Sequence, residues 1–223
     1  MVIIPGFLGG DSSTTIIRRV LKEANYDVYG ANLDANPGLK ETAIQALEQH
    51  CQSIYKATGC KVTLIGHSAG GMLARIVGRR QAPIVRHVIS IGSPFKANLK
   101  VGFGGLLGRA HDAFTNRKEV RQLVDNGEYH APLPVPATSI FSKGDAFANW
   151  KFCLEVADEK TENIRVIGSH SGMLFNPLVL DLLLNRLQEP EENWQPYAAH
   201  GITKYWVKPI CAKQHILHWV IGQ

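Results

Sequence analysis

Residues 61–71 read KVTLIGHSAGG and carry the strongest structural signal in this chain. The apolar residues 62–65 predict a buried strand, and residues 72–77, MLARIV, predict a helix. Between them lies the pattern G-x-S-x-G, which predicts a sharp turn with Ser68 at its apex. A serine in such a turn has strained backbone angles. Gly66 and Gly70 then omit the Cβ atoms that would clash with the adjacent strand and helix.

The composition is that of an ordinary globular protein. The chain has 223 residues, of which 45% are hydrophobic and 19% charged, and its net charge is +5. Its basic residues are scattered and lack interleaved aromatics, which favours solvated helix faces over a nucleic-acid groove. The sequence contains no apolar run of about eighteen residues, so we expect no transmembrane segment.

The four cysteines, Cys51, Cys60, Cys153 and Cys211, form no CxxC pair and have no metal-type spacing with histidine. We interpret them as free, buried thiols in a reducing compartment. Met1 leads directly into a short apolar run that is too short for a signal-peptide core. These features favour a cytoplasmic protein, and a secreted protein whose leader has been removed stays open as the alternative.

Strand-like and helix-like segments alternate along most of the chain. This alternation predicts an α/β fold with a doubly wound, mostly parallel sheet and helices on both faces, in a single domain over residues 1–223. The expected strands are residues 2–4, 26–29, 62–65, 85–91, 137–141 and 163–167. The expected helices include residues 39–57, 72–77 and 177–187.

The alternation breaks over about residues 95–134, where glycines are mixed with apolar residues. A connection this long inside a compact domain is more often a functional insertion than a plain loop, so we expect a small cap or lid over the site. A partly disordered surface excursion is the alternative. The C-terminal tail, about 189–223, is rich in aromatic residues and matches no simple pattern.

Three residues have the types and the order that nucleophilic catalysis needs. A serine hydroxyl requires a nearby base, which a third group must orient. Asp145 follows the strand at 137–141, and His170 follows the strand at 163–167. With Ser68 they give the order serine, acid, histidine, each at the end of a strand. We therefore predict Ser68, His170 and Asp145 as a catalytic triad.

Other histidines and acids fit these roles less well. The side chain of His67 should point away from that of Ser68, so we expect it to support the turn. His87 lies within a strand, where a core role is the default. For the acid, Asp158 is the second choice, in a charged stretch typical of solvated surface, whereas Asp34 precedes the serine.

Acyl transfer also needs hydrogen-bond donors for the developing oxyanion. The backbone N–H of Ala69 follows the serine at the start of a helix. A second donor should come from the glycine-rich loop 5–10, PGFLGG, where we predict the N–H of Phe7, with Leu8 as the alternate. The pattern G-x-x-x-x-G-K-[ST] does not follow this loop, which argues against nucleotide binding.

Taken together, the motifs PGFLGG, GHSAGG, ISIGSPF, SKGD and GSHSGM resemble the α/β-hydrolase superfamily, and within it the bacterial lipase and esterase branch. The similarity covers about residues 2–188. It implies a reduced α/β-hydrolase fold without the usual first two strands. Two features depart from the family pattern: Pro5 replaces the usual histidine of the oxyanion loop, and residues 146–150 only partly match the segment after the acid.

The resemblance implies hydrolysis of carboxylic esters by a lipase or carboxylesterase, through an acyl-enzyme intermediate and without a metal or organic cofactor. The expected partner is a small-molecule or lipid ester, with peripheral contact to a lipid interface through the cap. Thioesterase, amidase and acyltransferase activity stay open, as does a non-catalytic binding module, because fold and triad do not fix the leaving group. The residues expected to bind substrate are Leu8, Met173, Leu174, Phe103, Leu106 and Leu107.

Overall fold

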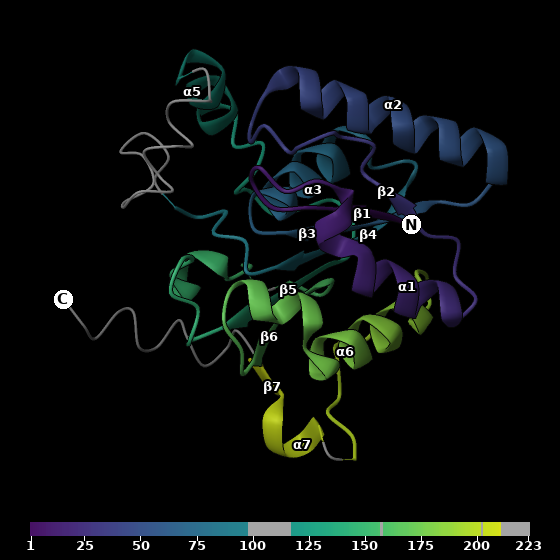
Figure 1. Ribbon diagram of the computed structural model, residues 1–223, viewed down its shortest axis with the longest axis vertical. Helices are drawn as coiled ribbons and strands as arrows, with labels where there is room; N and C mark the ends of the chain where they lie inside the picture. The colour runs from purple at the N-terminus through teal and green to yellow at the C-terminus, as the bar shows by residue number, and fades with distance from the viewer. Residues whose placement is uncertain (98–116, 157, 202, 211–223) are drawn as a thin grey trace.

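The computed structural model describes residues 1–97, 117–156, 158–201 and 203–210. Within them the chain forms a seven-stranded sheet in the order β2-β1-β3-β4-β5-β6-β7 (Figure 1). Neighbouring strands are parallel from β2 to β6, and β7 alone runs antiparallel, against β6. The prediction of a doubly wound, mostly parallel sheet is confirmed. The strands are β1 (Val2–Ile4), β2 (Tyr29–Gly30), β3 (Val62–His67), β4 (Val85–Ile91), β5 (Ala137–Ser142), β6 (Thr161–Val166) and β7 (Lys208–Ile210).

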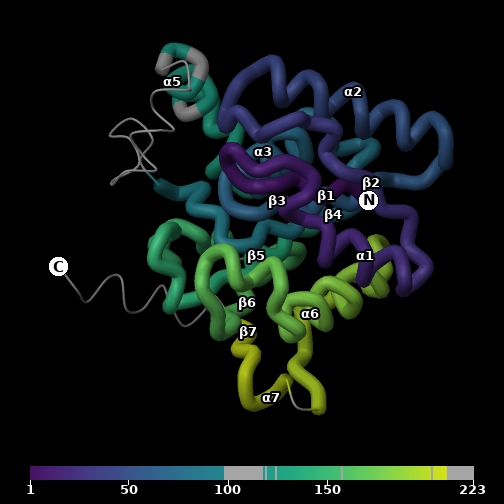
Figure 2. Tube along the Cα trace, in the orientation of Figure 1, coloured from purple at the N-terminus to yellow at the C-terminus, as the bar shows by residue number. Residues whose placement is uncertain are grey.

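Helices cover both faces of this sheet. Helices α2 (Glu41–Thr58), α3 (Ala69–Arg80) and α5 (Arg117–Asp125) pack on one face. Helices α1 (Thr15–Glu23) and α6 (Pro177–Gln188) lie side by side on the other (Figures 1 and 2). Short helical turns complete the described elements: η1 (Asp11–Thr14), η2 (Trp150–Cys153), η3 (Ser171–Phe175) and α7 (Thr203–Trp206).

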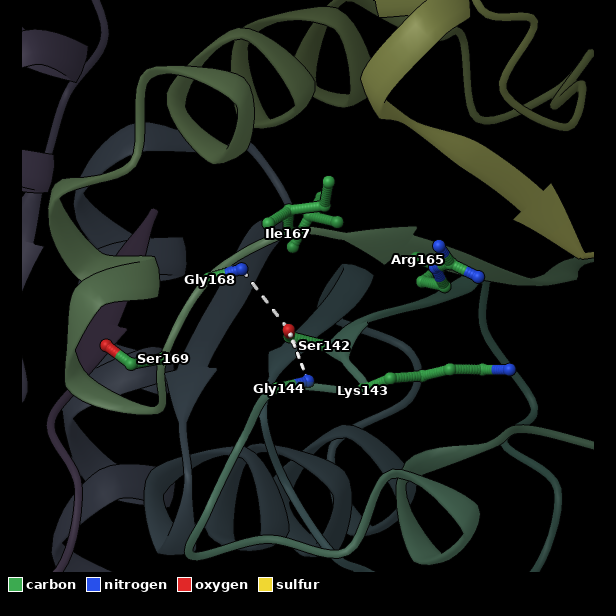
Figure 3. A pocket seen from close by; sticks show the side chains of 8 residues that line it. Ser142, Lys143, Gly144, Arg165, Ile167, Gly168 and Ser169 are labelled. Atoms are coloured by element: carbon green, nitrogen blue, oxygen red, sulfur yellow. Dashed lines mark hydrogen bonds between the residues drawn. The ribbon is translucent and has the colours of Figure 1, made fainter.

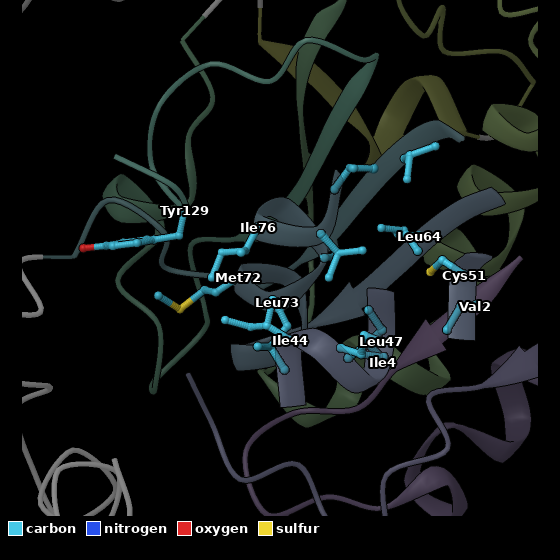
Figure 4. Packing of buried hydrophobic residues seen from close by; sticks show 14 of the residues in the cluster. Val2, Ile4, Ile44, Leu47, Cys51, Leu64, Met72, Leu73, Ile76 and Tyr129 are labelled. Atoms are coloured by element: carbon cyan, nitrogen blue, oxygen red, sulfur yellow. The ribbon is translucent and has the colours of Figure 1, made fainter. Parts of the chain in front are cut away.

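The strands divide the apolar core into two layers, because successive side chains of a strand point to opposite faces. Leu64 of β3 joins the layer under α2 and α3, which also contains Leu47 and Leu73 (Figure 4). The next residue, Ile65, joins the layer under α1 and α6. Each side chain buried this fully contributes about 1.5–3 kcal/mol to folding, so the two layers hold the central strands firmly.

The buried side chain of Arg75 joins the described ends of the 95–134 segment to helix α3. Its guanidinium donates to the carbonyl oxygens of Tyr129, at 2.6 Å, and Ala131, at 2.9 Å, and it pairs with the buried carboxylate of Glu155. It also lies 4.0 Å from the centre of the Phe95 ring. The start and the end of the segment are thereby fixed to the helix that follows Ser68.

The structure differs from the sequence-based expectations at several element boundaries, for example at β6, which covers Thr161–Val166 instead of 163–167, and in the tail and one cysteine. Strand β2 covers Tyr29–Gly30 instead of 26–29, because only these residues pair with β1. The tail supplies α7 and β7, which the sequence pattern did not predict. Cys51 and Cys153 are free and buried as expected, but Cys60 is exposed, since it follows the end of α2 at the surface. Cys211 lies outside the described residues.

No helix in the described ranges is long and apolar enough to cross a membrane.

Candidate active site

Ser68 sits in a strained turn between β3 and α3. Its backbone has φ of 53° and ψ of −123°, a region that non-glycine residues rarely adopt. The turn is held by hydrogen bonds on both sides of the peptide: the Ser68 amide donates to the Ile91 carbonyl at 2.9 Å, and its carbonyl accepts from the Gly71 amide at 3.0 Å. Strain that persists in this way at a polar residue points to a functional role.

The glycines that flank the serine are required by close packing. A Cβ atom on Gly66 would overlap the backbone of Gly70, and one on Gly70 would overlap the carbonyl groups of Ile4 and Pro5. The turn therefore packs closely against both α3 and the end of β1, as the spacing of the glycines predicts.

Asp145 and His170 are joined directly, although they lie 25 residues apart. The Nδ1–H of His170 donates to Oδ2 of Asp145 at 2.7 Å, and Oδ1 of Asp145 accepts from the amides of Phe147 and Ala148, both at 2.8 Å. Burial alone would raise the pKa of Asp145. The hydrogen bond from His170 and those from the two amides outweigh burial, so the pKa lies below its usual value. Asp145 is thus a carboxylate that orients the imidazole.

Gly92 links this pair to the serine turn. It directly follows Ile91, the acceptor of the Ser68 amide, and it has a left-handed φ of 56°. A Cβ atom there would lie 3.1 Å from Oδ2 of Asp145 and 3.4 Å from Nδ1 of His170. Ser68 and His170 both lie in the described part of the chain, and no hydrogen bond joins their side chains. Catalytic hydrogen bonds often tighten only when substrate binds.

His67 contacts the loop of His170 and not the hydroxyl of Ser68. Its Nε2 lies 3.1 Å from the His170 carbonyl oxygen, and the two imidazole rings are 4.6 Å apart between centres. Burial, together with the nearby charge of His170, lowers the pKa of His67 to about 4. A neutral ring can donate from Nε2 to that carbonyl, so His67 connects the serine turn to the histidine loop.

Ser142, at the end of β5, joins the two loops that carry Asp145 and His170. Its Oγ accepts hydrogen bonds from the amide of Gly144 at 3.1 Å and from the amide of Gly168 at 3.2 Å (Figure 3). Ser142 is not among the residues that the sequence predicts for the site. The contact to Gly168 spans 26 residues and cannot be read from local sequence.

The glycine-rich loop after β1 lies beside the serine turn. A Cβ atom on Gly6 would lie 3.4 Å from the Cβ of Ser68. Leu8 has a left-handed φ of 59°, and its amide donates to the Asn36 carbonyl at 2.8 Å. That amide is thus already engaged, so Leu8, the alternate oxyanion donor, does not offer its N–H to a substrate.

Asn36 is a residue of this site that sequence reasoning missed. Its buried side chain donates from Nδ2 to the Pro5 carbonyl at 2.6 Å, and its amide donates to the Gly9 carbonyl at 2.9 Å. With the bond from Leu8, three contacts from one residue hold the loop. The second candidate donor, the amide of Ala69, lies at the first residue of α3, where the helix dipole favours negative charge.

The six residues predicted to bind substrate do not share one environment in the structure. Met173 and Leu174 are buried in the core layer under α1 and α6. We therefore do not include them among the residues proposed to contact substrate. Leu8 is half exposed on the glycine-rich loop. Phe147, which was not predicted, is 66% exposed, and its ring lies 5.5 Å from that of His170. The remaining three, Phe103, Leu106 and Leu107, lie outside the described residues.

The alternative acid, Asp158, lies far from His170 along the sheet. Its carboxylate accepts from the Lys160 amide at 2.7 Å, just before the first residue of β6, whereas His170 follows the last. Asp158 therefore caps a turn at the opposite end of that strand. Among the described residues, no three histidine, cysteine or acidic side chains group as metal ligands would.

Comparison with sequences and with solved structures gives different results. No protein-family model matches the chain, and no curated protein matches its sequence. Solved structures do match. Aspergillus fumigatus lipase B is 18% identical with a TM-score of 0.66, and the match covers 85% of this chain and 52% of the lipase. This chain thus spans about half the length of that enzyme.

Two other solved structures are matched over most of their length. Mouse alpha/beta hydrolase domain-containing protein 10 is 17% identical with a TM-score of 0.58, over 83% of this chain and 86% of that one. A monoacylglycerol lipase from Paleococcus ferrophilus is 14% identical with a TM-score of 0.58, over 82% of this chain and 93% of that one. At this identity the likeness concerns the fold. With its strand order and the strained serine turn after β3, this chain has the α/β-hydrolase fold.

Proposed function

We propose that this protein is a serine hydrolase that cleaves carboxylic esters, with Ser68 as nucleophile, His170 as general base and acid, and Asp145 as the group that orients the histidine. The observation that carries the proposal is the 2.7 Å hydrogen bond between His170 and Asp145, at the edge of the sheet where Ser68 occupies its strained turn. The lipases among the structural neighbours support the same reaction class.

The first half of the reaction forms an acyl-enzyme. Because Nδ1–H of His170 is held by the Asp145 carboxylate, the lone pair of Nε2 is available to take the proton of the Ser68 hydroxyl. Oγ attacks the ester carbonyl, and the oxyanion receives hydrogen bonds from the amides of Phe7 and Ala69. His170 then gives its proton to the leaving alcohol.

The second half releases the acid by the same route. Water loses a proton to Nε2 of His170 and attacks the acyl-enzyme carbonyl, and collapse of the intermediate returns the proton to Ser68. The lowered pKa of Asp145 keeps it ionised while the imidazolium forms, so the carboxylate stabilises that charge. Exposed Phe147, whose ring lies beside that of His170, suits the acyl part of a small-molecule or lipid ester, as does exposed Leu8 on the glycine-rich loop.

A labelling experiment tests the nucleophile. A fluorescent alkyl phosphonate should label the protein at one site, and peptide mass analysis should place the label on Ser68. The variant Ser53→Ala removes an exposed serine of α2 and should label like the wild type. Labelling at another serine, or undiminished labelling of Ser68→Ala, would contradict the assignment.

A substrate series tests the reaction class. We expect p-nitrophenyl esters to be hydrolysed, and the rates across acyl lengths, with and without an oil–water interface, to separate an esterase from a lipase. Matched thioesters and amides probe the other acyl-transfer activities. A protein that is labelled at Ser68 but hydrolyses thioesters much faster than oxygen esters would favour a thioesterase.

Asn36→Ala should lower kcat by about 10- to 100-fold, because the loop that carries Phe7 loses its side-chain anchor and the oxyanion donor is less well positioned. KM should change little, since Asn36 is fully buried and is not exposed to a substrate. The control Asn193→Ala, at an exposed position of the tail, should leave both constants unchanged. A higher KM with an unaltered kcat would show that Asn36 does not position the donor.

A further inference from the structure

A hollow of about 310 Å³ lies against the outer side of the loops that follow β5 and β6. It is distinct from the side chains of the proposed triad, although Gly144 and Ser169 of its lining adjoin Asp145 and His170 in sequence. Figure 3 shows Lys143, which follows the last residue of β5, and Arg165, on the neighbouring strand β6, among the side chains that line it. The lining residues are Ser142, Lys143, Gly144, Arg165, Val166, Ile167, Gly168 and Ser169.

The two cations of this hollow have no acidic partner among the described residues. Lys143 is held in place by an aromatic ring instead: its Nζ lies 4.7 Å from the centre of the Trp150 ring, which stacks on Phe141. By contrast, the buried arginines Arg75 and Arg186 each pair with a glutamate.

A third cation adds to the charge on this face. Lys208 of β7 is the direct partner of Arg165 in the antiparallel register, so their side chains project from the same face of the sheet. Phe141, which supports Trp150 under Lys143, is the partner of Arg165 on the other side. Like charges placed opposite each other destabilise a sheet, so the pairing of Arg165 with Lys208 carries a cost in stability. An anionic ligand would remove that cost.

We propose that this hollow binds a phosphate group, carried by a small soluble molecule or by a lipid headgroup. A guanidinium offers a planar pair of donors to phosphate oxygens, and the two ammonium groups supply further point charges for a dianion. The hollow has room for the phosphate and part of the molecule attached to it. Exposed Ile167 gives an apolar edge to the same site. The site does not depend on the proposed ester hydrolysis.

Titration with inorganic phosphate, followed by amide NMR shifts at constant ionic strength, tests the site. We expect saturable shifts at Lys143, Gly144, Arg165 and Ser169. Arg165→Gln should weaken binding by at least about tenfold, since one charge-assisted contact is lost. Lys56→Gln, at an exposed position on α2, should bind phosphate like the wild type. Absent shifts, or unchanged affinity in Arg165→Gln, would overturn the proposal.

Thermal melts separate a binding role from a structural one. Without phosphate, Arg165→Gln should raise Tm by about 2 °C, because repulsion from Lys208 is relieved. Phosphate should raise Tm of the wild type more than that of the variant. A variant that melts at a lower temperature and still binds phosphate normally would show that Arg165 has a structural role, contrary to the proposal.

Vesicles identify the source of the phosphate. Sedimentation with phosphatidylcholine vesicles, with and without phosphatidylglycerol, is compared between wild type and Arg165→Gln. Binding to the anionic vesicles that falls in the variant supports a lipid headgroup. Phosphate shifts without vesicle binding support a soluble ligand. If neither phosphate nor vesicles bind in an Arg165-dependent way, the hollow is not a phosphate site.

Discussion

Replacing Ser68 with alanine is expected to lower kcat for a p-nitrophenyl ester by about 10⁴- to 10⁶-fold, the loss that follows removal of a catalytic serine when the remaining groups stay in place. The alanine has the same backbone demands as the serine, with φ of 53°, so the fold should be retained. Steady-state hydrolysis rates, with circular dichroism as the check on folding, measure the effect.

The proposed triad also leads us to expect that the losses of kcat in single variants will not multiply in a double variant. His170→Ala alone should cost about as much as Ser68→Ala, and the double variant should be no slower than either single one, because the two groups act as a unit. Asp145→Asn should cost less, about 10³- to 10⁴-fold, since the imidazole loses its orienting charge but stays in the site. Losses that multiply in the double variant would contradict a shared proton-transfer step.

The strand, the serine turn and the helix around Ser68 could be predicted from the sequence. A short apolar strand, the glycines around Ser68 and the following helix are signals confined to about fifteen residues, and the packing at Gly66 and Gly70 follows the expected geometry. The positions of Asp145 and His170 after successive strands could also be read, because parallel strands end at the same edge of a sheet.

The parts that depend on long-range contacts could not be predicted. Asn36 is one polar residue in a polar loop until its bonds to the glycine-rich loop, 31 residues away at Pro5, are seen. Strand β7 is only three residues long and contains Pro209, so its pattern is weak. It exists because β6 offers an open edge, and proline is tolerated on an edge strand. Residues 98–116, which make up much of the predicted cap, lie outside the described ranges.

Acidification is expected to destabilise this fold well above the pH at which its carboxylates titrate. His87 is buried, and its Nε2 lies 3.0 Å from Oγ1 of Thr138. Burial and the nearby charges of Arg86 and Arg186 lower its pKa to about 3, and the pKa of His67 is about 4. The folded protein keeps both rings neutral at pH 5, whereas the unfolded chain protonates them below its ordinary histidine pKa of about 6.5.

The sign of the effect follows from this difference in bound protons. Below about pH 6.5 the unfolded state binds more protons, so the free energy of unfolding falls as the pH falls towards about 4. At pH 5 each histidine should contribute a loss of about 2 kcal/mol relative to pH 8, or about 4 kcal/mol together. Asp145, with its lowered pKa, loses its stabilising contribution only at lower pH. Glu48 and Glu155 have raised pKa values and act in the opposite direction.

A matched pair of variants separates the contribution of His87 to the pH dependence of the unfolding free energy from the contributions of the glutamates. His87→Gln keeps a donor for Thr138 but cannot take a proton, so its loss between pH 8 and pH 5 should be smaller than that of the wild type by about 2 kcal/mol. His200→Gln removes an exposed ring and should follow the wild-type curve. The comparison uses the change in unfolding free energy between the two pH values, measured by urea titration, so any constant cost of the substitution cancels. Equal losses in wild type and His87→Gln would mean that the buried His87 does not couple folding to protons.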